Sequence, residues 1–296
     1  MDKTPSHMVG NTLIEALPYI RRFSGQTVVV KYGGHAMVDE ELKKAFALNV
    51  IMLRAVGIYP VVVHGGGPQI GQLLKKLDIS CSFVDGMRVT TPEVMNVVEM
   101  VLAGTVNGEI VRLINQHGGR AVGLSGNDGG LIRARRMTLT RQHESDQPSE
   151  IVDLGLVGEV TQVDPHVLQA LEHGNFIPVI APVGVGPEGE SLNINADLVA
   201  SALAAALRAA KLILLTDTVG VLDQAGQLIS ELNREAAGRL KTAGVIQGGM
   251  IPKVACCLTA LSAGVERAHI IDGRVPNAIL LEMFTDQGVG TVITER

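Results

Sequence analysis

The sequence is poor in the residues that several classes of site require. It contains no tryptophan, only three cysteines in 296 residues, and no basic block longer than "RARR" at 133–136. A nucleic-acid-binding protein presents a basic face, whereas the formal net charge here is -5, so we expect no nucleic-acid partner. Cys81, Cys256 and Cys257 form neither a CxxC motif nor a framework of paired bridges, which favours a reducing compartment.

The sequence also shows no recognisable targeting segment and no uninterrupted long hydrophobic run. The N-terminus shows no basic segment followed by an apolar core and a cleavage site, so it predicts no secretory signal. The most apolar stretch, 198–215, contains Arg208 and Lys211 and therefore predicts a buried helix followed by a strand. We expect a cytoplasmic protein that does not enter a membrane.

Runs of β-branched residues alternate with helical patterns along most of the chain. Uniformly apolar runs such as "VVVK" and "VVVH" imply strands buried on both faces, which predicts an α/β protein with an open, mainly parallel sheet sandwiched by helices. The expected strands are 26–32, 59–64, 120–124, 176–181, 211–216 and 268–272. The expected helices are 39–56, 67–77, 92–117, 164–173, 195–209, 234–243 and 252–264. The segments 82–90 and 130–162 read as antiparallel hairpins, with an exposed turn at 140–150.

A cluster of proline and glycine at 181–190 suggests two lobes. We expect an N-terminal helix within residues 1–25, an N-terminal lobe at 26–181 and a C-terminal lobe at 182–296. The segment 11–23 places four apolar residues on one helical face: Leu13, Ile14, Leu17 and Ile20. This stripe needs a surface to bury it, either on its own domain or on another subunit.

Two strands end in glycine-rich turns, "TVVVKYGGHAM" (27–37) and "PVVVHGGGPQI" (60–70). Ligands of open parallel sheets bind beyond the carboxyl ends of strands, and glycine there lets backbone N–H groups approach an anion. Neither stretch is a P-loop or a GxGxxG fingerprint, and each could be a simple tight connection. Lys31, at the tip of a strand expected to be central, favours a role toward a ligand because burying an unpaired ammonium is costly.

Four further segments carry polar residues at the ends of expected elements. In "SLNINADLVASAL" (191–203), Asn195 can cap a helix and Asp197 can complement its dipole, whereas Asn193 has no such structural reason. "LTDTVGVLD" (215–223) predicts a loop after a strand, and "VIQGGMIPKVACCL" (245–258) places Lys253 on a helix after two glycines. Arg88 in "DGMRVT" and Lys253 could each be ordinary surface cations.

The sequence shows no GxSxG, no HExxH and no cysteine near a plausible histidine partner. Two lysines, anion-friendly turns, an aspartate, asparagines and an arginine suit phosphoryl transfer, in which positioning and neutralisation of charge dominate. An acceptor that is already a carboxylate anion needs no protein base.

Taken together and in this order, "KYGGHAM", "VVVHGGGPQI", "GMRVT", "NINAD", "LTDTVGVL" and "GGMIPKV" resemble the amino acid kinase family, and within it the N-acetylglutamate kinases. The resemblance implies phosphorylation of the γ-carboxylate of N-acetyl-L-glutamate by ATP in arginine biosynthesis. It assigns Lys31 and Lys253 to the transferring phosphoryl group, with Asp197 holding both lysines. Mg²⁺ would arrive on the ATP phosphates, so no protein metal site is expected. The other implied contacts are Gly33 and Gly34 for phosphate; Gly66, Gly67, Arg88 and Asn193 for the acceptor; and Asp217, Thr218, Val219, Gly220, Val221, Leu222, Gln247, Gly248 and Gly249 for the nucleotide.

The N-terminal helix and the tail at 269–293 resemble the arginine-inhibited branch of these kinases. That resemblance implies a homo-oligomer, a trimer of dimers linked by exchanged N-terminal helices, with L-arginine bound near His269, Glu282 and Gly288. The segment 277–283 could instead be only a packing helix. The sequence leaves open whether a nitrogen-signalling protein binds.

Two alternatives remain at this level. Another kinase of the same fold, acting on aspartate, glutamate, carbamate or uridylate, shares the general pattern, although aspartate kinases and many glutamate kinases carry a further C-terminal domain. A non-catalytic arginine sensor on the same fold is a different class, and the retained lysine pair argues against it.

Overall fold

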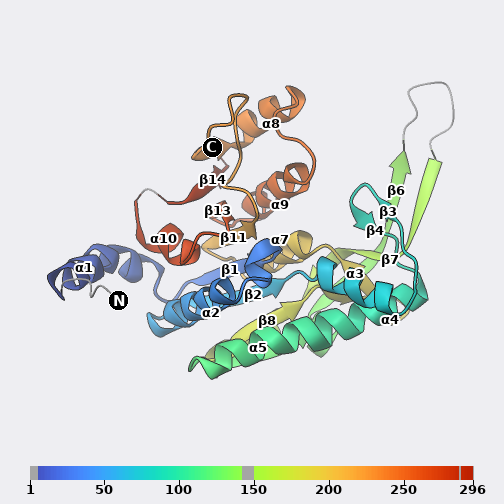
Figure 1. Cartoon of the computed structure of the whole chain (residues 1–296), viewed down its shortest axis with the longest axis horizontal. Helices are drawn as coiled ribbons and strands as arrows, with labels where there is room; N and C mark the ends of the chain where they lie inside the picture. Colours follow the sequence, from blue (N-terminus) through green and yellow to red (C-terminus); the bar gives the residue numbers. More distant parts are fainter. Residues whose placement is uncertain (1–5, 142–149, 287, 296) are drawn as a thin grey trace.

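The computed structural model describes residues 6–141, 150–286 and 288–295, and its centre is one eight-stranded sheet (Figure 1). All neighbouring strands run parallel except β13 and β14. The mainly parallel sheet predicted from the apolar runs is therefore confirmed. In spatial order the strands are β12 (Glu231–Asn233), β14 (Gly290–Thr294), β13 (Arg267–Asp272), β11 (Lys211–Thr216), β1 (Thr27–Tyr32), β2 (Tyr59–His64), β8 (Ile177–Ala181) and β5 (Ala121–Ser125).

Helices cover both faces of this sheet because its central strands are apolar on both sides. Val28 and Val30 of β1 face one hydrophobic core, and Val29 between them faces the other. The first core includes residues of α2 (Glu40–Ala55), α3 (Gly67–Lys76), α4 (Pro92–Glu99), α5 (Asn107–Gln116) and α10 (Ala278–Phe284). The second includes residues of α6 (His166–His173), α7 (Ala196–Ala206), α8 (Arg234–Thr242) and α9 (Met250–Ser262).

A small closed barrel adjoins the second face. It consists of the long hairpin β6 (Ile132–Arg141) and β7 (Glu150–Val163) with the short strands β9 (Val183–Val185) and β10 (Ser191–Ile194). The two hairpins predicted at 82–90 and 130–162 are confirmed, the first as β3 (Phe83–Val84) and β4 (Met87–Arg88). Most of the turn expected at 140–150 lies outside the described residues.

The helix predicted over 92–117 is continuous but not uniformly α-helical. A π-helical segment, η2 (Met100–Val106), joins α4 to α5. A single π segment shifts the side chains that follow it around the helix axis, which apolar periodicity does not reveal. The edge strand β12 and its neighbour β14 were also missed, because both are short.

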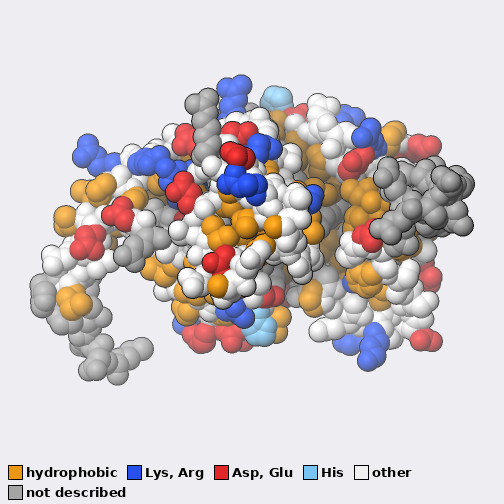
Figure 2. Space-filling view, turned by 90° about the horizontal axis from the view of Figure 1, so that it is seen from above, with side chains coloured by type: hydrophobic (Ala, Val, Ile, Leu, Met, Phe, Trp, Pro, Cys, Tyr) orange, Lys and Arg blue, Asp and Glu red, His pale blue; other side chains and the backbone are white. Residues whose placement is uncertain are grey.

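The N-terminal helix α1 (Ser6–Phe23) lies within the range 1–25 in which a helix was expected, and it is found at one end of the molecule (Figure 1). Leu13 and Ile14 are 56% and 69% exposed, and Leu17 is exposed as well. Figure 2 shows hydrophobic side chains on the outer surface of the left end, where α1 lies. The apolar stripe therefore leaves three of its four residues uncovered by the chain itself.

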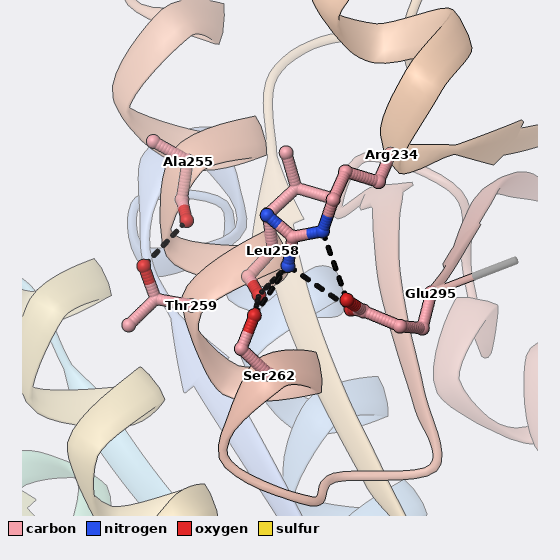
Figure 3. A network of polar contacts seen from close by, with 6 residues as sticks. All are labelled: Arg234, Ala255, Leu258, Thr259, Ser262 and Glu295. Atoms are coloured by element: carbon pink, nitrogen blue, oxygen red, sulfur yellow. Dashed lines mark hydrogen bonds and ion pairs between the residues drawn. The ribbon is translucent and has the colours of Figure 1, made fainter.

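The C-terminal elements are joined by an arginine. Arg234, the first residue of α8, donates from Nε and Nη2 to the two carboxylate oxygens of Glu295, at 2.9 and 3.0 Å, and from Nη2 to the carbonyl of Leu258 at 2.9 Å (Figure 3). The same guanidinium bonds the Ser262 hydroxyl. These contacts hold the start of α8, the end of α9 and the residue after β14 together. Within the described residues, no helix is both long and apolar enough to cross a membrane.

Candidate active site

Two lysines far apart in the sequence meet at one aspartate. The Nζ atom of Lys31 lies 3.2 Å from Oδ1 of Asp197, and that of Lys253 lies 2.7 Å from Oδ2. The Asp197 side chain is only 6% exposed, and those of the lysines are 12% and 19% exposed. The carboxylate therefore separates two ammonium groups and holds both near the same space.

Local sequence explains how each group reaches this point. Lys31 is the penultimate residue of β1, so it lies at the carboxyl edge of the sheet. Asn195 caps α7 by accepting from the Asp197 N–H at 2.7 Å, which places Asp197 in the first turn as predicted. Lys253 lies in the first turn of α9, and α9 packs against α7.

Burial would raise the pKa of the Asp197 carboxyl, but the two neighbouring ammonium groups outweigh it and hold the pKa below its ordinary value. Asp197 is therefore ionised at neutral pH. It carries one negative charge against two positive charges, so the cluster keeps a net positive charge. Such a cluster suits an anionic group that enters between the lysines.

A cavity of about 310 Å³ opens beside this cluster. It receives residues from the first glycine-turn strand, the second glycine turn, the β3–β4 hairpin, β10 and α9. The predicted site residues that line it are Lys31, Gly66, Gly67, Arg88, Asn193, Asp197 and Lys253. Five separate sequence segments thus bring these seven residues to one space.

Arg88 and Asn193 lie on the wall of this cavity and are joined through Thr90. The Arg88 guanidinium donates to the Gly67 carbonyl at 3.1 Å and stacks over the Phe83 ring at 4.7 Å. The Asn193 amide donates to the Thr90 hydroxyl at 3.2 Å, which in turn donates to the Arg88 carbonyl at 2.8 Å. Thr90 is fully buried and was not singled out from the sequence; its signal was a polar residue directly after the hairpin.

The first glycine turn lies against Lys31 and Asp217. A Cβ atom on Gly33 would lie 2.6 Å from the Lys31 Nζ, so any larger residue would displace the lysine. Gly34 has φ +73°, and a Cβ there would overlap the Asp217 carboxylate. Asp217 Oδ1 accepts from the His35 N–H at 2.5 Å. Gly33 and Gly34 thus lie next to the lysine cluster, although they do not line the 310 Å³ cavity itself.

The segments predicted to contact nucleotide lie farther out. Residues 217–222 follow β11, and the Val221 N–H donates to the Thr291 hydroxyl at 2.8 Å. Residues 247–249 directly precede α9, which carries Lys253. Neither segment lines the 310 Å³ cavity; they extend the edge of the sheet on the side of β11 and α9.

A second cavity of about 210 Å³ lies between α1, β11, β13 and α10. His269, Glu282 and Gly288 all line it, as do Tyr19, Lys211 and Arg267. Glu282 lies 2.7 Å from Nδ1 of His269 and accepts from the Val289 N–H at 3.0 Å. Gly288 has φ +60°, and a Cβ there would lie 2.8 Å from the Glu282 carboxylate. The three residues predicted from the tail therefore share one pocket.

Three titratable groups that line this second cavity are buried: Lys211, His269 and Glu282. Lys211 donates to the Glu282 carbonyl at 3.2 Å and lies 4.9 Å from the centre of the Phe23 ring. Burial lowers the pKa of Lys211 to about 8, and burial also lowers the pKa of His269. Lys211 was missed as a site residue. The sequence signal for Lys211 was its position at the start of the apolar run "KLILLT", because a lysine buried in a strand requires a polar partner.

No three His, Cys, Asp or Glu side chains in the described parts of the chain are grouped so that they could hold a metal ion. Cys256 and Cys257 are buried in α9. Burial raises the pKa of the Cys256 thiol to about 12, which makes it inert as a nucleophile at neutral pH.

Residues 26–272 match the model of the amino acid kinase family. The chain belongs to this family. The match covers the sheet from β1 to β13, together with both lysines and Asp197, and it confirms the family and fold class predicted from the motifs.

Curated relatives are similar over almost their full length. The acetylglutamate kinase of Alkalilimnicola ehrlichii is 59% identical over 295 residues, which cover 100% of this chain and 97% of the relative. The acetylglutamate kinase of Geobacter sulfurreducens is 62% identical over 283 residues, which cover 96% and 97%.

Two solved structures of one enzyme are also similar to the chain. N-acetylglutamate synthase from Neisseria gonorrhoeae, complexed with coenzyme A and N-acetyl-glutamate, aligns with a TM-score of 0.83 at 26% identity, over 97% of this chain and 63% of the synthase. The same synthase with coenzyme A and L-arginine aligns with a TM-score of 0.78 at 25% identity, over 97% and 65%.

Proposed function

We propose that the protein transfers the γ-phosphoryl group of ATP to the γ-carboxylate of N-acetyl-L-glutamate, as the name acetylglutamate kinase of its curated relatives suggests. The observation that carries this proposal is the pairing of Lys31 and Lys253 on Asp197 beside a cavity large enough for a small acidic substrate. The products are N-acetyl-L-glutamyl 5-phosphate and ADP, in a pathway for arginine biosynthesis.

In this reaction a γ-carboxylate oxygen attacks the γ-phosphorus, and the bond from that phosphorus to the β–γ bridging oxygen breaks, leaving its electron pair on ADP. No proton moves, which fits a site without a general base. Lys31 and Lys253 neutralise charge on the transferring group, and Asp197 keeps them apart and oriented. ATP enters as its Mg²⁺ complex, with the metal on phosphate oxygens.

The acceptor is held by the walls of the 310 Å³ cavity. The Arg88 guanidinium offers a planar fork for the α-carboxylate, which is a geometry suited to carboxylate binding. Asn193 donates to the same substrate, and the N–H groups of Gly66 and Gly67 receive its γ-carboxylate. Gly33 and Gly34 face the phosphates. Residues 217–222 and 247–249 hold the nucleotide.

We also infer feedback inhibition by L-arginine, with the inhibitor in the 210 Å³ cavity. A guanidinium there would pair with Glu282 while Lys211 attracts the carboxylate. Residues 1–25 would link subunits through the exposed face of α1, with residues 26–181 forming the acceptor-binding, dimerising lobe and 182–296 the lobe for ATP and arginine. The resulting assembly would be a trimer of dimers.

An ADP-release assay with a panel of acceptors tests the proposal. We expect turnover with N-acetyl-L-glutamate to exceed turnover with glutamate, aspartate, carbamate and UMP, because Arg88 and the apolar part of the cavity select an acylated amino acid. Each acceptor is measured with and without L-arginine. Equal rates for all acceptors contradict the proposed substrate, and ADP release that ignores every acceptor contradicts a kinase function.

A further inference from the structure

The second glycine turn is held in place by a buried histidine that no step of the proposed reaction uses. His64 ends β2 and is fully buried. Its Nδ1 atom lies 2.9 Å from the Gly65 carbonyl oxygen, and its Nε2 atom lies 3.2 Å from the Asn107 side-chain nitrogen. Asn107 is the first residue of α5, directly after the π-helical segment.

The surroundings of Asn107 determine which ring nitrogen carries the proton. The same Asn107 nitrogen lies 2.9 Å from the Val179 carbonyl and 3.3 Å from the Leu124 carbonyl, and carbonyl oxygens only accept. The atom is therefore the amide NH₂, and Nε2 of His64 must accept from it. The proton then lies on Nδ1, which donates to the Gly65 carbonyl. Burial lowers the pKa of His64 to about 4, so the ring is neutral in this tautomer at neutral pH.

This bond orients the peptide that follows it. In a trans peptide the C=O of one residue and the N–H of the next point in opposite directions. A Gly65 carbonyl directed at the His64 ring therefore turns the Gly66 N–H away from the ring. The Gly66 carbonyl accepts from the Ile70 N–H at 2.9 Å. By the same trans geometry, the Gly67 N–H points away from Ile70.

The π-helical segment closes the other side of the turn. A Cβ on Gly66 would lie 2.5 Å from Cδ2 of Leu102 and 3.5 Å from Cγ2 of Val106, so the turn packs directly on this segment. Both Leu102 and Gly66 line the 310 Å³ cavity. The extra residue in the helical turn brings Leu102 to Gly66 and Asn107 to His64 at once.

We propose that His64 and Asn107 are positioning residues that aim the Gly66 N–H at the acceptor in the 310 Å³ cavity. The inference rests on the proposed function, because the acceptor is the anion that this N–H would meet. His64 acts through the Gly65 carbonyl and does not touch the substrate. Asn107 acts one step farther away, by fixing the His64 tautomer.

Two substitutions at His64 separate its two bonds. His64→Asn retains an amide near the Nδ1 position, which can donate to the Gly65 carbonyl, but it loses the hydrogen bond to Asn107. His64→Gln retains an amide near the Nε2 position, which can bond Asn107, but it loses the hydrogen bond to the Gly65 carbonyl. We expect His64→Gln to lower kcat roughly 10²-fold, as a misaimed transition-state donor does, with an unchanged KM for ATP. We expect His64→Asn to keep kcat within a few-fold of the wild type.

Asn107→Ala and its matched control Asn115→Ala provide a second measurement. Both asparagines lie on α5 and bond backbone groups, but Asn115 bonds Ala121, away from the glycine turn. We expect Asn107→Ala to lower kcat more than Asn115→Ala. Imidazole ¹⁵N NMR, with the His64 signal assigned by its loss in His64→Asn, should show the Nδ1–H tautomer in the wild type and a shift toward the other tautomer in Asn107→Ala.

The outcomes distinguish this inference from the proposed function. Wild-type protein that does not phosphorylate N-acetyl-L-glutamate overturns both. With an active wild type, equal kcat values for His64→Asn and His64→Gln overturn the positioning role alone, as does an Nε2–H tautomer. If His64→Gln does not fold, the Asn107→Ala kcat and tautomer decide, and values equal to those of Asn115→Ala overturn it.

Discussion

The Nζ atom of Lys253 lies 2.7 Å from Oδ2 of Asp197, although 56 residues separate them in the chain. The other carboxylate oxygen faces Lys31, which lies on the central strand β1. A single carboxylate therefore joins the central strand of the sheet, the start of α7 and the start of α9. In the proposed reaction, neutralisation of charge on the phosphoryl group would depend on this arrangement, because in the described parts of the chain Asp197 is the acidic partner that both lysines share.

Replacing Lys253 by alanine should lower kcat by about 10²–10³-fold, because it removes one of two groups that stabilise charge in the transition state. The coupled ADP-release assay measures this change, and thermal unfolding checks that the fold persists. Lys241→Ala, on the exposed side of α8, serves as the matched control and should leave kcat unchanged. A Lys253→Ala enzyme as fast as this control would show that the ammonium is only a surface charge.

Replacing Asp197 by asparagine should destabilise the fold by about 3–5 kcal/mol near neutral pH, because two poorly exposed ammonium groups lose their partner. The folded pKa of Asp197 lies below its unfolded value of about 3.9. Its stabilising contribution is thus present above that value and is lost as the pH falls through the folded pKa. Denaturant unfolding should therefore show a difference between wild type and Asp197→Asn that shrinks on acidification below about pH 4. The exposed Asp78→Asn provides the reference, and a pH-independent difference would contradict this account.

Substituting alanine for Gly288 should weaken the proposed inhibition by arginine. A left-handed alanine costs about 1–2 kcal/mol, and its Cβ would also press on the Glu282 carboxylate at 2.8 Å. We expect the arginine concentration for half-inhibition to rise roughly tenfold, since each 1.4 kcal/mol corresponds to a factor of ten. Gly226→Ala is the control, because Gly226 has φ +77° but open space around it. If both substitutions changed the arginine concentration for half-inhibition equally, Glu282 would not be part of the inhibitor site.

If the proposed assembly and inhibition exist, deleting residues 1–24 should break the proposed trimer of dimers and weaken the proposed inhibition by arginine. The deletion removes the exposed face of α1 together with Tyr19 and Phe23 at the second cavity. Light scattering measures the particle mass. The double substitution of Leu13 and Ile14 by serine should also reduce this mass, whereas Leu77→Ser, at an equally exposed apolar residue after α3, should not. An unchanged mass for the deletion would mean that α1 forms no subunit contact.

The fold class followed from apolar runs, because strands such as β1 and β11 are buried on both faces and carry little polar patterning. Their bounds agree with the predicted ranges to within one residue. The π-helical segment at Met100–Val106 could not be predicted in this way. Its Leu102 and Val106 are apolar and buried, as core-facing residues of an α-helix also are, so the apolar pattern of the sequence does not mark the insertion.

Individual residues of the candidate site could be predicted only where they stood in motifs that occur in the order typical of the family. Lys31, Asp197 and Lys253 stood in such motifs, and the structure places them in contact. Thr90, Lys211 and His64 did not stand out, because each could be an ordinary buried or half-buried polar residue in its own segment. Their importance comes from a partner elsewhere in the chain: Asn193 for Thr90, Glu282 for Lys211 and Asn107 for His64.

The sequence by itself determined six of the eight strands of the central sheet, the family and the residue types available for phosphoryl transfer, since these depend on local patterning and on motifs read in order. The resemblance implied that Asp197 holds both lysines, but only the tertiary structure decided how closely it does so, that the tail residues and α1 enclose a second cavity, and which His64 nitrogen carries the proton. Each of these depends on distances of about 3 Å between groups from separate strands and helices, which no spacing along a single chain specifies.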